Sequence, residues 1–480
     1  MYTLGGFRFI VYKFSSTMFN MKLMEKLRFI LSKFNSNLSH PKLMDKSRFE
    51  ASEFNTLFNP NTMEKTAEDL SFDVLWLIFA NLELPDLVRA GSVCSIWRDI
   101  YTSLCNSGSY NPQHTPCLLY TSESASARAA CLYSLAEKKT YTLTLPDPPL
   151  RSRYIFGSSY GWIATADERS ELHIVNPITG DQIALPSVIT IEWVKPIFSD
   201  TGAICGYEHS GYFGVWITSG IPSIFDLSEL RDYLFYKVFL SSDPSAGEYF
   251  VVLIHNPHCQ LSFARAGDDR WTLLPHGDSY EDCLFNGRLL YACTRFGEIH
   301  EFDLGTPAMT HKILLDRVKD IYDEKIYIVQ ASCGELLQIW RYDDTLEEGD
   351  GEEEYHSDSE LALDRELPWY STSMIKVHKV EPASKKLVEI SSLGANALFL
   401  GHNQSLCLHA EEHPQLKANH VYFADDEPYI AFKNKRRDIG VFDLEHNRSE
   451  KIVSPQLWSN WPAPVWLVPN LKRISLSLCK

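Results

Sequence analysis

The chain has 480 residues, of which 45% are hydrophobic and 22% are charged, so it holds enough apolar side chains for a large core. Its 62 acidic and 45 basic residues give a formal net charge of −17, which argues against a nucleic-acid binder with a generally basic surface. No apolar run reaches the length of a membrane span and no secretory signal is recognisable, so we expect no membrane partner. The 11 cysteines form no CxxC pair, which favours a reducing compartment, the cytoplasm or the nucleus.

Residues 1–65 form a basic leader with three repeats of twenty residues or slightly fewer. Each repeat carries an Arg-Phe pair near its start, at Arg8-Phe9, Arg28-Phe29 and Arg48-Phe49. The leader is rich in Ser, Asn and Lys, which predicts a mostly disordered extension. Two alternatives stay open: a short solenoid, and an organelle-directing presequence, because Glu25 is the single acid in residues 1–44.

Residues 66–105 predict a compact unit of three short helices. Leu70, Val74, Leu77 and Ile78 follow a helical apolar spacing, and Pro85 suits the first position of a second helix. Three helices of this size bury too little surface to be strongly stable alone, so we expect one apolar face to dock on something else. The third helix is predicted from an apolar stripe at Val93, Ile96, Trp97, Ile100, Tyr101 and Leu104.

The stretch from Asp69 to Ile100 resembles an F-box, the module that docks the adaptor subunit of a cullin-RING ubiquitin ligase. The residues that carry the resemblance are Leu70, Asp73, Val74, Leu75, Ile78, Leu82, Asp86, Leu87, Val93, Cys94, Trp97 and Arg98. Ser71 stands where the motif usually has proline, a change that would weaken docking by removing an apolar contact. The alternative is a small helical cap on the next domain. The adaptor-binding face implied by the resemblance comprises Leu70, Val74, Leu75, Ile78, Leu82, Pro85, Leu87, Val93, Cys94 and Trp97.

Residues 110–475 predict a domain made entirely of β-strands, because short β-branched and aromatic runs recur between turn residues. Several of these runs form predicted β-hairpins, and weaker hairpin candidates start near Val215, Ile339 and Val377. The starts of the hairpins are mostly about 38–46 residues apart, which is the length of a four-stranded propeller blade. We therefore expect a β-propeller of six or seven blades, seven if Ile339 and Val377 share one blade that is split by an insertion. The segments with the clearest hairpin layout are 132–146, 173–186, 262–275, 299–313 and 441–452.

Residues 343–366 form the expected insertion, with twelve acidic residues and one base, Arg365. Too few apolar residues are present to pack, so we expect a mobile acidic loop. Three roles stay open: a solvated charge run without a partner, a docking surface for a basic partner, and a phosphorylation target at Ser357 or Ser359.

The β region resembles the KIB-type β-propeller of plant F-box proteins. Together with the F-box, this resemblance implies a substrate-recognition subunit of an SCF-type ubiquitin ligase. The F-box would bind the adaptor that links it to the cullin, and the propeller would bind a target protein that the sequence does not identify. The alternative is a propeller interaction protein that is not coupled to a ligase and is directed to an organelle by the leader. The segments that carry the resemblance are 157–164, Asn176-Pro177, 398–408, 419–426, 440–445 and 461–471.

Three patterns of catalytic or metal chemistry occur, but their surroundings do not suit the chemistry. Residues 157–161 match the nucleophile-elbow pattern with Ser159 as nucleophile, yet the following residues predict a strand where that motif needs a helix. Residues 409–413 have the inverted zinc-protease spacing but precede Pro414 and lie between strands. Residues 255–259 place two His and one Cys around an Asn-Pro turn without a fourth ligand. We therefore expect no catalytic residue, metal or cofactor, and target binding at the loop face or central channel of the propeller.

Overall fold

The computed structural model of the chain describes two compact units. The first comprises Met1–Leu4, Arg8–His114 and Leu471–Arg473, and the second comprises Gly5–Phe7, Thr115–Asn470 and Ile474–Lys480. Apart from the paired strands β1 (Thr3–Leu4) and β2 (Phe7–Arg8), the predicted leader lies outside the described residues. The described residues are 3–4, 7–8, 72–80, 82, 87, 90–91, 94–107, 115–210, 222–275, 279–305, 309–320, 324–345, 370–413, 415–426 and 437–470. Among them no helix is long and apolar enough to cross a bilayer.

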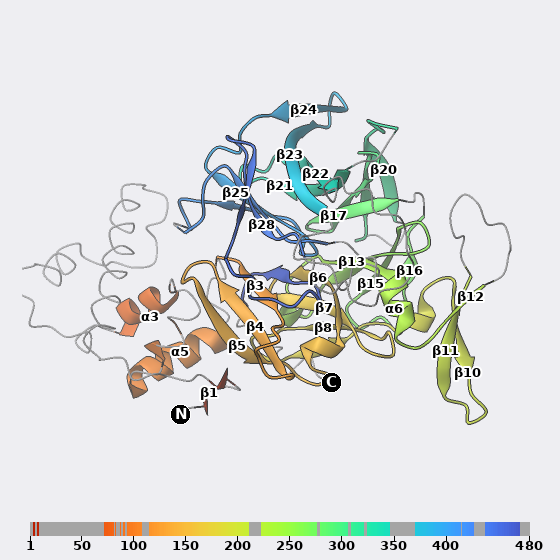
Figure 1. Cartoon of the computed structure of the whole chain (residues 1–480), viewed down its shortest axis with the longest axis horizontal. Coiled ribbons are helices and arrows are strands. Elements are labelled where there is room, and N and C mark those ends of the chain that lie inside the picture. The colour runs from red at the N-terminus through yellow and green to blue at the C-terminus, as the bar shows by residue number, and fades with distance from the viewer. Residues whose placement is uncertain are drawn as a thin grey trace, which may run out of the picture. The chain divides into compact units, whose positions relative to one another are not determined.

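Within the described residues of the first unit, the helices α3 (Phe72–Ala80) and α5 (Ser95–Ser107) pack against each other (Figure 1). Phe79 and Trp97 meet edge to face, with ring centroids 5.2 Å apart. A Cβ at Gly91 would lie 2.8 Å from the Tyr101 side chain, so only glycine allows this close approach. The middle helix predicted after Pro85 lies mostly outside the described residues. The buried apolar residues of the unit are Leu75, Phe79, Leu82, Leu87, Ala90, Trp97, Ile100 and Leu104.

The second unit is a β-propeller of six blades within the described residues, numbered here in ring order (Figure 1). Blade 1 has β30 (Val465–Leu467), β3 (Cys117–Tyr120), β4 (Ala129–Ser134) and β5 (Lys139–Thr144); blade 2 has β6 (Tyr154–Ser159), β7 (Trp162–Ala166), β8 (Leu172–Val175) and β9 (Gln182–Ala184). Blade 3 has β13 (Phe235–Leu240), β14 (Phe250–His255), β15 (Gln260–Arg265) and β16 (Thr272–Leu273); blade 4 has β17 (Tyr280–Asn286), β18 (Leu289–Thr294), β19 (Ile299–Asp303) and β20 (Thr310–Leu315). Blade 5 has β21 (Glu324–Gln330), β22 (Leu336–Thr345), β23 (Tyr370–Glu381) and β24 (Lys386–Ile390); blade 6 has β26 (Leu406–His409), β25 (Asn396–Leu400), β27 (His420–Phe423), β28 (Gly440–Asp443) and β29 (Arg448–Lys451).

The remaining elements lie between blades, except η4, which connects β13 and β14 within blade 3. Helix α6 (Glu229–Leu234) precedes blade 3, and the short 3-10 turns are η2 (Leu150–Ser152), η3 (Val188–Thr190) and η4 (Pro244–Ala246). A three-stranded sheet, which we name the arm, consists of β10 (Val194–Phe198), β11 (Ile204–His209) and β12 (Ser223–Phe225). Figure 1 shows the arm projecting from the ring beside α6.

The ring closes because strands from the beginning and the end of the second unit share blade 1. Strand β30 pairs antiparallel with β3, with Val465 opposite Leu119. Phe399 of blade 6 meets Trp466 of blade 1 edge to face at 5.2 Å, which joins the last blade to the first. The inner strands of the other neighbouring blades also contact one another: β30 with β6, β6 with β13, β13 with β17, β17 with β21, and β21 with β26. Because β6 contacts β13 directly, the arm is no seventh blade. The number of seven, expected if Ile339 and Val377 share a blade, is therefore wrong for the described residues, and the alternative of six blades is confirmed.

The predicted hairpins are the two outer strands of blades. Five of them correspond to β4-β5, β8-β9, β15-β16, β19-β20 and β28-β29. Ile339 and Val377 pair directly on β22 and β23, so one blade is indeed split by an insertion. The predicted start of the acidic loop is too early, because Asp343 and Asp344 still lie in β22 and continue its pairing with β23. Residues 346–369 lie outside the described residues.

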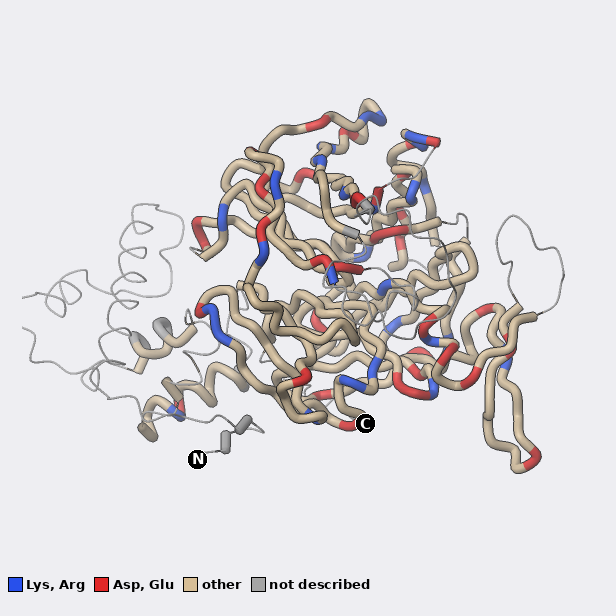
Figure 2. Tube along the Cα trace, in the orientation of Figure 1, with Lys and Arg blue, Asp and Glu red and all other residues tan. Residues whose placement is uncertain are grey.

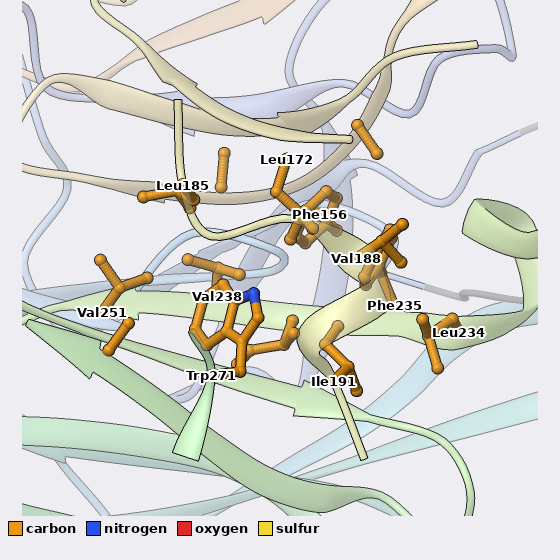
Figure 3. Packing of buried hydrophobic residues seen from close by; sticks show 14 of the residues in the cluster. Phe156, Leu172, Leu185, Val188, Ile191, Leu234, Phe235, Val238, Val251 and Trp271 are labelled. Atoms are coloured by element: carbon orange, nitrogen blue, oxygen red, sulfur yellow. The ribbon is translucent and has the colours of Figure 1, made fainter. Parts of the chain in front are cut away.

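The apolar cores lie between neighbouring blades. Figure 3 shows the cluster between blades 2 and 3, where Phe156 and Phe235 stack with ring centroids 5.0 Å apart. Trp271 enters the same cluster, and its indole N–H donates a hydrogen bond to the Pro186 carbonyl at 2.9 Å. Each blade presents apolar side chains to its neighbours in this way, so the sequence alternates apolar positions in short strands without any long helical stripe.

Candidate functional site

The adaptor-binding face predicted for the helical unit divides into two groups in the structure. Leu75, Leu82, Leu87 and Trp97 are buried, so they stabilise the unit itself. Their contact with an adaptor stays a prediction. Cys94 is half-buried. The side chains of Leu70, Val74, Ile78, Pro85 and Val93 lie outside the described residues, and their role stays a prediction.

Two apolar side chains of this unit that the predicted face left out are exposed. Phe72 on α3 is 49% exposed and Ile96 on α5 is 57% exposed. Ile96 belongs to the predicted apolar stripe, but α5 turns Trp97, Ile100 and Leu104 inward, and their i, i+3, i+7 spacing leaves Ile96 exposed. Large exposed apolar side chains on a small helical unit are candidates for partner contact.

Buried charges from blades 3 and 4 form an ion pair near the axis of the propeller. Lys237 Nζ on β13 lies 2.8 Å from Asp282 Oδ1 on β17, and both side chains are almost completely buried. Asp282 Oδ2 also accepts hydrogen bonds from the Ile328 N–H and the Ser405 hydroxyl, each at 2.9 Å. Burial raises the pKa of Asp282, and the Lys237 ammonium offsets part of that rise. One carboxylate therefore holds together the inner parts of blades 3 to 6.

A second group of charges joins blades 5 and 6. Asp426, which follows β27, accepts hydrogen bonds from Lys325 Nζ at 3.0 Å and from the Tyr327 hydroxyl at 3.1 Å. Burial opposes ionisation of Asp426, but Lys325 and other nearby cations outweigh it and hold its pKa below the ordinary value. Arg341 Nη2 lies 3.0 Å from Asp438 Oδ2, which also accepts hydrogen bonds from Thr372. These charged groups are engaged with each other, which suits a structural role.

The segment 401–405, between β25 and β26, crosses the axis of the ring. His402, Asn403, Gln404 and Ser405 are all buried. The Gln404 N–H donates to the Ser158 carbonyl of blade 2 at 2.8 Å, and Ser405 reaches Asp282 of blade 4. Because blades 2, 4 and 6 alternate around the ring, one segment that touches all three fills the centre. The expectation of target binding in the central channel is therefore not supported by the described residues, and the outer surfaces remain.

The catalytic and metal patterns fall on β-hairpins and turns. Ser159 ends β6 and Trp162 begins β7, so the chain turns from strand to strand where a nucleophile elbow needs a helix. His409 ends β26, and a turn follows it. His255 Nε2 lies 2.8 Å from the Ser262 hydroxyl, and burial lowers the pKa of His255 to about 4. Among the described residues no group of three or more His, Cys, Asp or Glu side chains is arranged to hold a metal ion.

Comparisons with known proteins agree with the architecture of both units. Residues 132–443 match the KIB1-4 beta-propeller family, and residues 68–106 match the F-box domain. The F-box/kelch-repeat protein KIB1 of Arabidopsis thaliana is 30% identical over 395 residues, which cover 80% of this chain and 85% of that protein. The F-box protein KIB4 of the same plant is 24% identical over 408 residues, which cover 80% of this chain and 93% of that protein. The chain therefore belongs to the KIB1-4 β-propeller family and is an F-box protein of the substrate-adaptor type.

Proposed function

We propose that this chain is the target-recognition subunit of an SCF-type ubiquitin ligase. The observation that carries the proposal is the presence of an F-box and a closed propeller on one chain. The F-box would bind the adaptor that connects it to the cullin, and the propeller would hold a target protein near the ubiquitin-loaded arm of the ligase. Catalysis would then come from proximity supplied by the assembly, without a catalytic residue in this chain. We place this activity in the cytoplasm or nucleus, where the ten free cysteines of the described residues would stay reduced.

The exposed residues of the helical unit supply a docking surface for the adaptor. Phe72 and Ile96 lie on different helices, and together they expose apolar area on a unit whose other described large apolar side chains are buried or half-buried. Burying one such side chain at an interface contributes about 1.5–3 kcal/mol. We expect both residues to contact the adaptor, in addition to the predicted positions whose side chains are not described.

The test is adaptor binding by the full-length chain with Phe72→Asp and Ile96→Asp combined. A charged residue at each position should weaken the affinity for a recombinant adaptor–cullin complex at least about 10-fold, because each aspartate loses apolar contact and must be desolvated on binding. The thermal midpoint should stay close to that of the unmodified protein, since both side chains are exposed. The matched control combines Ile313→Asp and Val388→Asp, two exposed residues on β20 and β24 of the propeller, and should bind normally.

Trp97→Ala gives a different outcome from the surface variant. Its side chain is buried against Phe79, so truncation should destabilise the helical unit by about 3–5 kcal/mol and remove binding by unfolding it. Unchanged adaptor affinity in the Phe72 and Ile96 variant would contradict the proposed surface. Failure of the unmodified chain to bind any adaptor would contradict the ligase role and leave the uncoupled interaction protein as the function.

A further inference from the structure

The arm is a rigid platform because one of its faces is anchored to the propeller. Val194 and Tyr207 belong to the apolar cluster between blades 2 and 3, and Phe225 packs against it. The Tyr207 hydroxyl donates a hydrogen bond to the Arg169 carbonyl at 2.6 Å, and His209 is buried against Tyr233 with ring centroids 5.3 Å apart. The arm is therefore fixed at its base, although it lies outside the ring.

The opposite face of the arm exposes apolar side chains around one ion pair. Lys195, Glu208 and Ile224 lie opposite one another on the three strands, and Lys195 Nζ is 3.5 Å from Glu208 Oε1. On this face Ile224 is 73% exposed, and Trp193 beside the base of β10 is also exposed. Phe198 at the end of β10 is 60% exposed but alternates with Val194 and Pro196, so it lies on the other face. Among the described residues of the propeller unit, no other sheet exposes three large apolar side chains in this way. Such a concentration marks a contact surface.

Acidic residues predominate in the arm and in the residues that flank it. The described residues 192–210 and 222–229, which include the first residue of α6, contain five acids and one base, a net charge of −4. Figure 2 shows the projecting part as mostly uncharged, with an acid at its tip. A partner segment that is apolar and basic would therefore be attracted, and an acidic one would be repelled. The acids are Glu192, Asp200, Glu208, Asp226 and Glu229, and the base is Lys195.

The edges of the arm offer unequal opportunities for strand addition. Strands β10 and β12 each pair only with β11 among the described residues. Pro196 lies in the middle of β10 and has no backbone N–H, a common way to block pairing at an edge. Strand β12 carries no proline and has the exposed Ile224 at its centre. An extended segment can therefore add its backbone along β12 and place alternate side chains over the exposed face.

We propose that the arm docks an extended segment of the target protein in which apolar residues alternate with lysine or arginine. The inference rests on the proposed function, because it names the surface with which the receptor recognises its target. The apolar side chains would pack against Ile224 and Trp193, and the basic ones would approach the acids of the arm. Residues 401–405 occupy the centre of the ring, and the charges there are paired with each other. Among the described residues, Ile224 of the arm is the most exposed large apolar side chain.

The test uses two synthetic twelve-residue peptides and the full-length chain. One peptide alternates valine with lysine, the other alternates valine with glutamate, and both carry a fluorophore for anisotropy titration. The lysine peptide should bind at least ten times more tightly than the glutamate peptide, and its affinity should fall as salt rises. The variant that combines Trp193→Ser and Ile224→Ser should lose at least tenfold in affinity for the lysine peptide. The control that combines Ile313→Ser and Val388→Ser should bind as the unmodified chain does.

Equal binding of the two peptides would overturn the inference, and so would normal affinity in the arm variant. Thermal midpoints close to that of the unmodified chain would show that the arm variant is folded, as expected for two exposed residues. Adaptor binding separates this inference from the proposed function, because the arm variant should still bind the adaptor–cullin complex. A chain that binds the lysine peptide through the arm but binds no adaptor would retain the docking surface and lose the ligase role.

Discussion

Blade 3 meets its two neighbours in different ways. Toward blade 2 its first strand stacks Phe235 on Phe156 in an apolar cluster. Toward blade 4 the same strand adds a buried ion pair, Lys237 with Asp282, to a second apolar cluster. Apolar packing has little directional demand, so one boundary can tolerate small changes of side-chain shape. A buried ion pair requires its partner, because removal of one member leaves a charge without water or counter-ion. The two boundaries should therefore respond differently to substitution, pH and salt.

The largest effect is expected when the buried pair is broken on one side. Lys237→Met keeps much of the side-chain volume and its contact with the Tyr327 ring, but it leaves Asp282 buried without its cation. Loss of one member of a buried pair costs about 3–5 kcal/mol, so the free energy of unfolding in urea should fall by that amount. Phe235→Leu at the apolar boundary, which keeps an apolar group there, should cost less.

A double variant separates the charge from the packing. Lys237→Met combined with Asp282→Asn removes both charges while the amide can still accept the hydrogen bonds of Ile328 and Ser405. It should recover at least half of the stability that Lys237→Met loses, because no unpaired charge remains. A double variant that is less stable than the single variant would show that the charge of Asp282 is itself favourable there.

The next effect is a pH dependence from Glu281, the residue that precedes Asp282 on β17. Burial raises the pKa of Glu281 to about 7, although Arg295 lies 3.6 Å away. Since this pKa is higher than the unfolded value of about 4.3, the folded state binds the extra proton, and the stability that it contributes is lost as pH rises from about 4 to 7. The slope is at most about 1.4 kcal/mol per pH unit. Unfolding free energies measured from pH 5 to 8 should decline toward pH 7 relative to those of Glu281→Gln.

Three buried histidines act in the opposite direction, so the difference between variants is the informative quantity. Burial lowers the pKa of His209, His255 and His402 to about 4, and each therefore contributes stability that is lost as pH falls from about 6.5 toward 4. These contributions cancel when Glu281→Gln is compared with the unmodified chain. The cost of Phe235→Leu should be constant over the same range. A cost that changed with pH would mean that the apolar boundary is coupled to the charges.

The sequence predicted the parts of this molecule that depend on local pattern. Short apolar strands and the spacing of the outer hairpins identified the propeller, because each blade repeats the same local pattern. The pairing of Lys237 with Asp282 could not be predicted, since it depends on which blades are neighbours and not on residues close in sequence. The arm could not be predicted either, because its strands have the same composition as blade strands. They therefore made a seventh blade plausible.

Adjacent residues in the helical unit show the limit of periodicity. Ile96 and Trp97 fit the same apolar stripe, and only the rotation of α5 against α3 decides that Trp97 is buried and Ile96 is exposed. The predicted adaptor face followed the motif and so included core residues such as Leu75 and Leu87. A sequence motif records which residues a module requires, and it does not separate those that stabilise the module from those that contact a partner.

The smallest effect is expected from a second Lys–Asp pair that matches the buried one in distance. Lys385 Nζ lies 3.0 Å from Asp316 Oδ1 and joins blades 4 and 5, as the buried pair joins blades 3 and 4. The side chains of Lys385 and Asp316 are 48% and 62% exposed, compared with 4% and 0% for Lys237 and Asp282. Water and salt screen such a pair, so Lys385→Met should change the free energy of unfolding by only about 0–1 kcal/mol, and less at high salt. If both lysine substitutions cost the same, distance rather than burial would determine the importance of a pair. If only Lys237→Met is severe, burial makes the charges at the centre of the propeller indispensable, whereas those on its rim can change with little loss of stability.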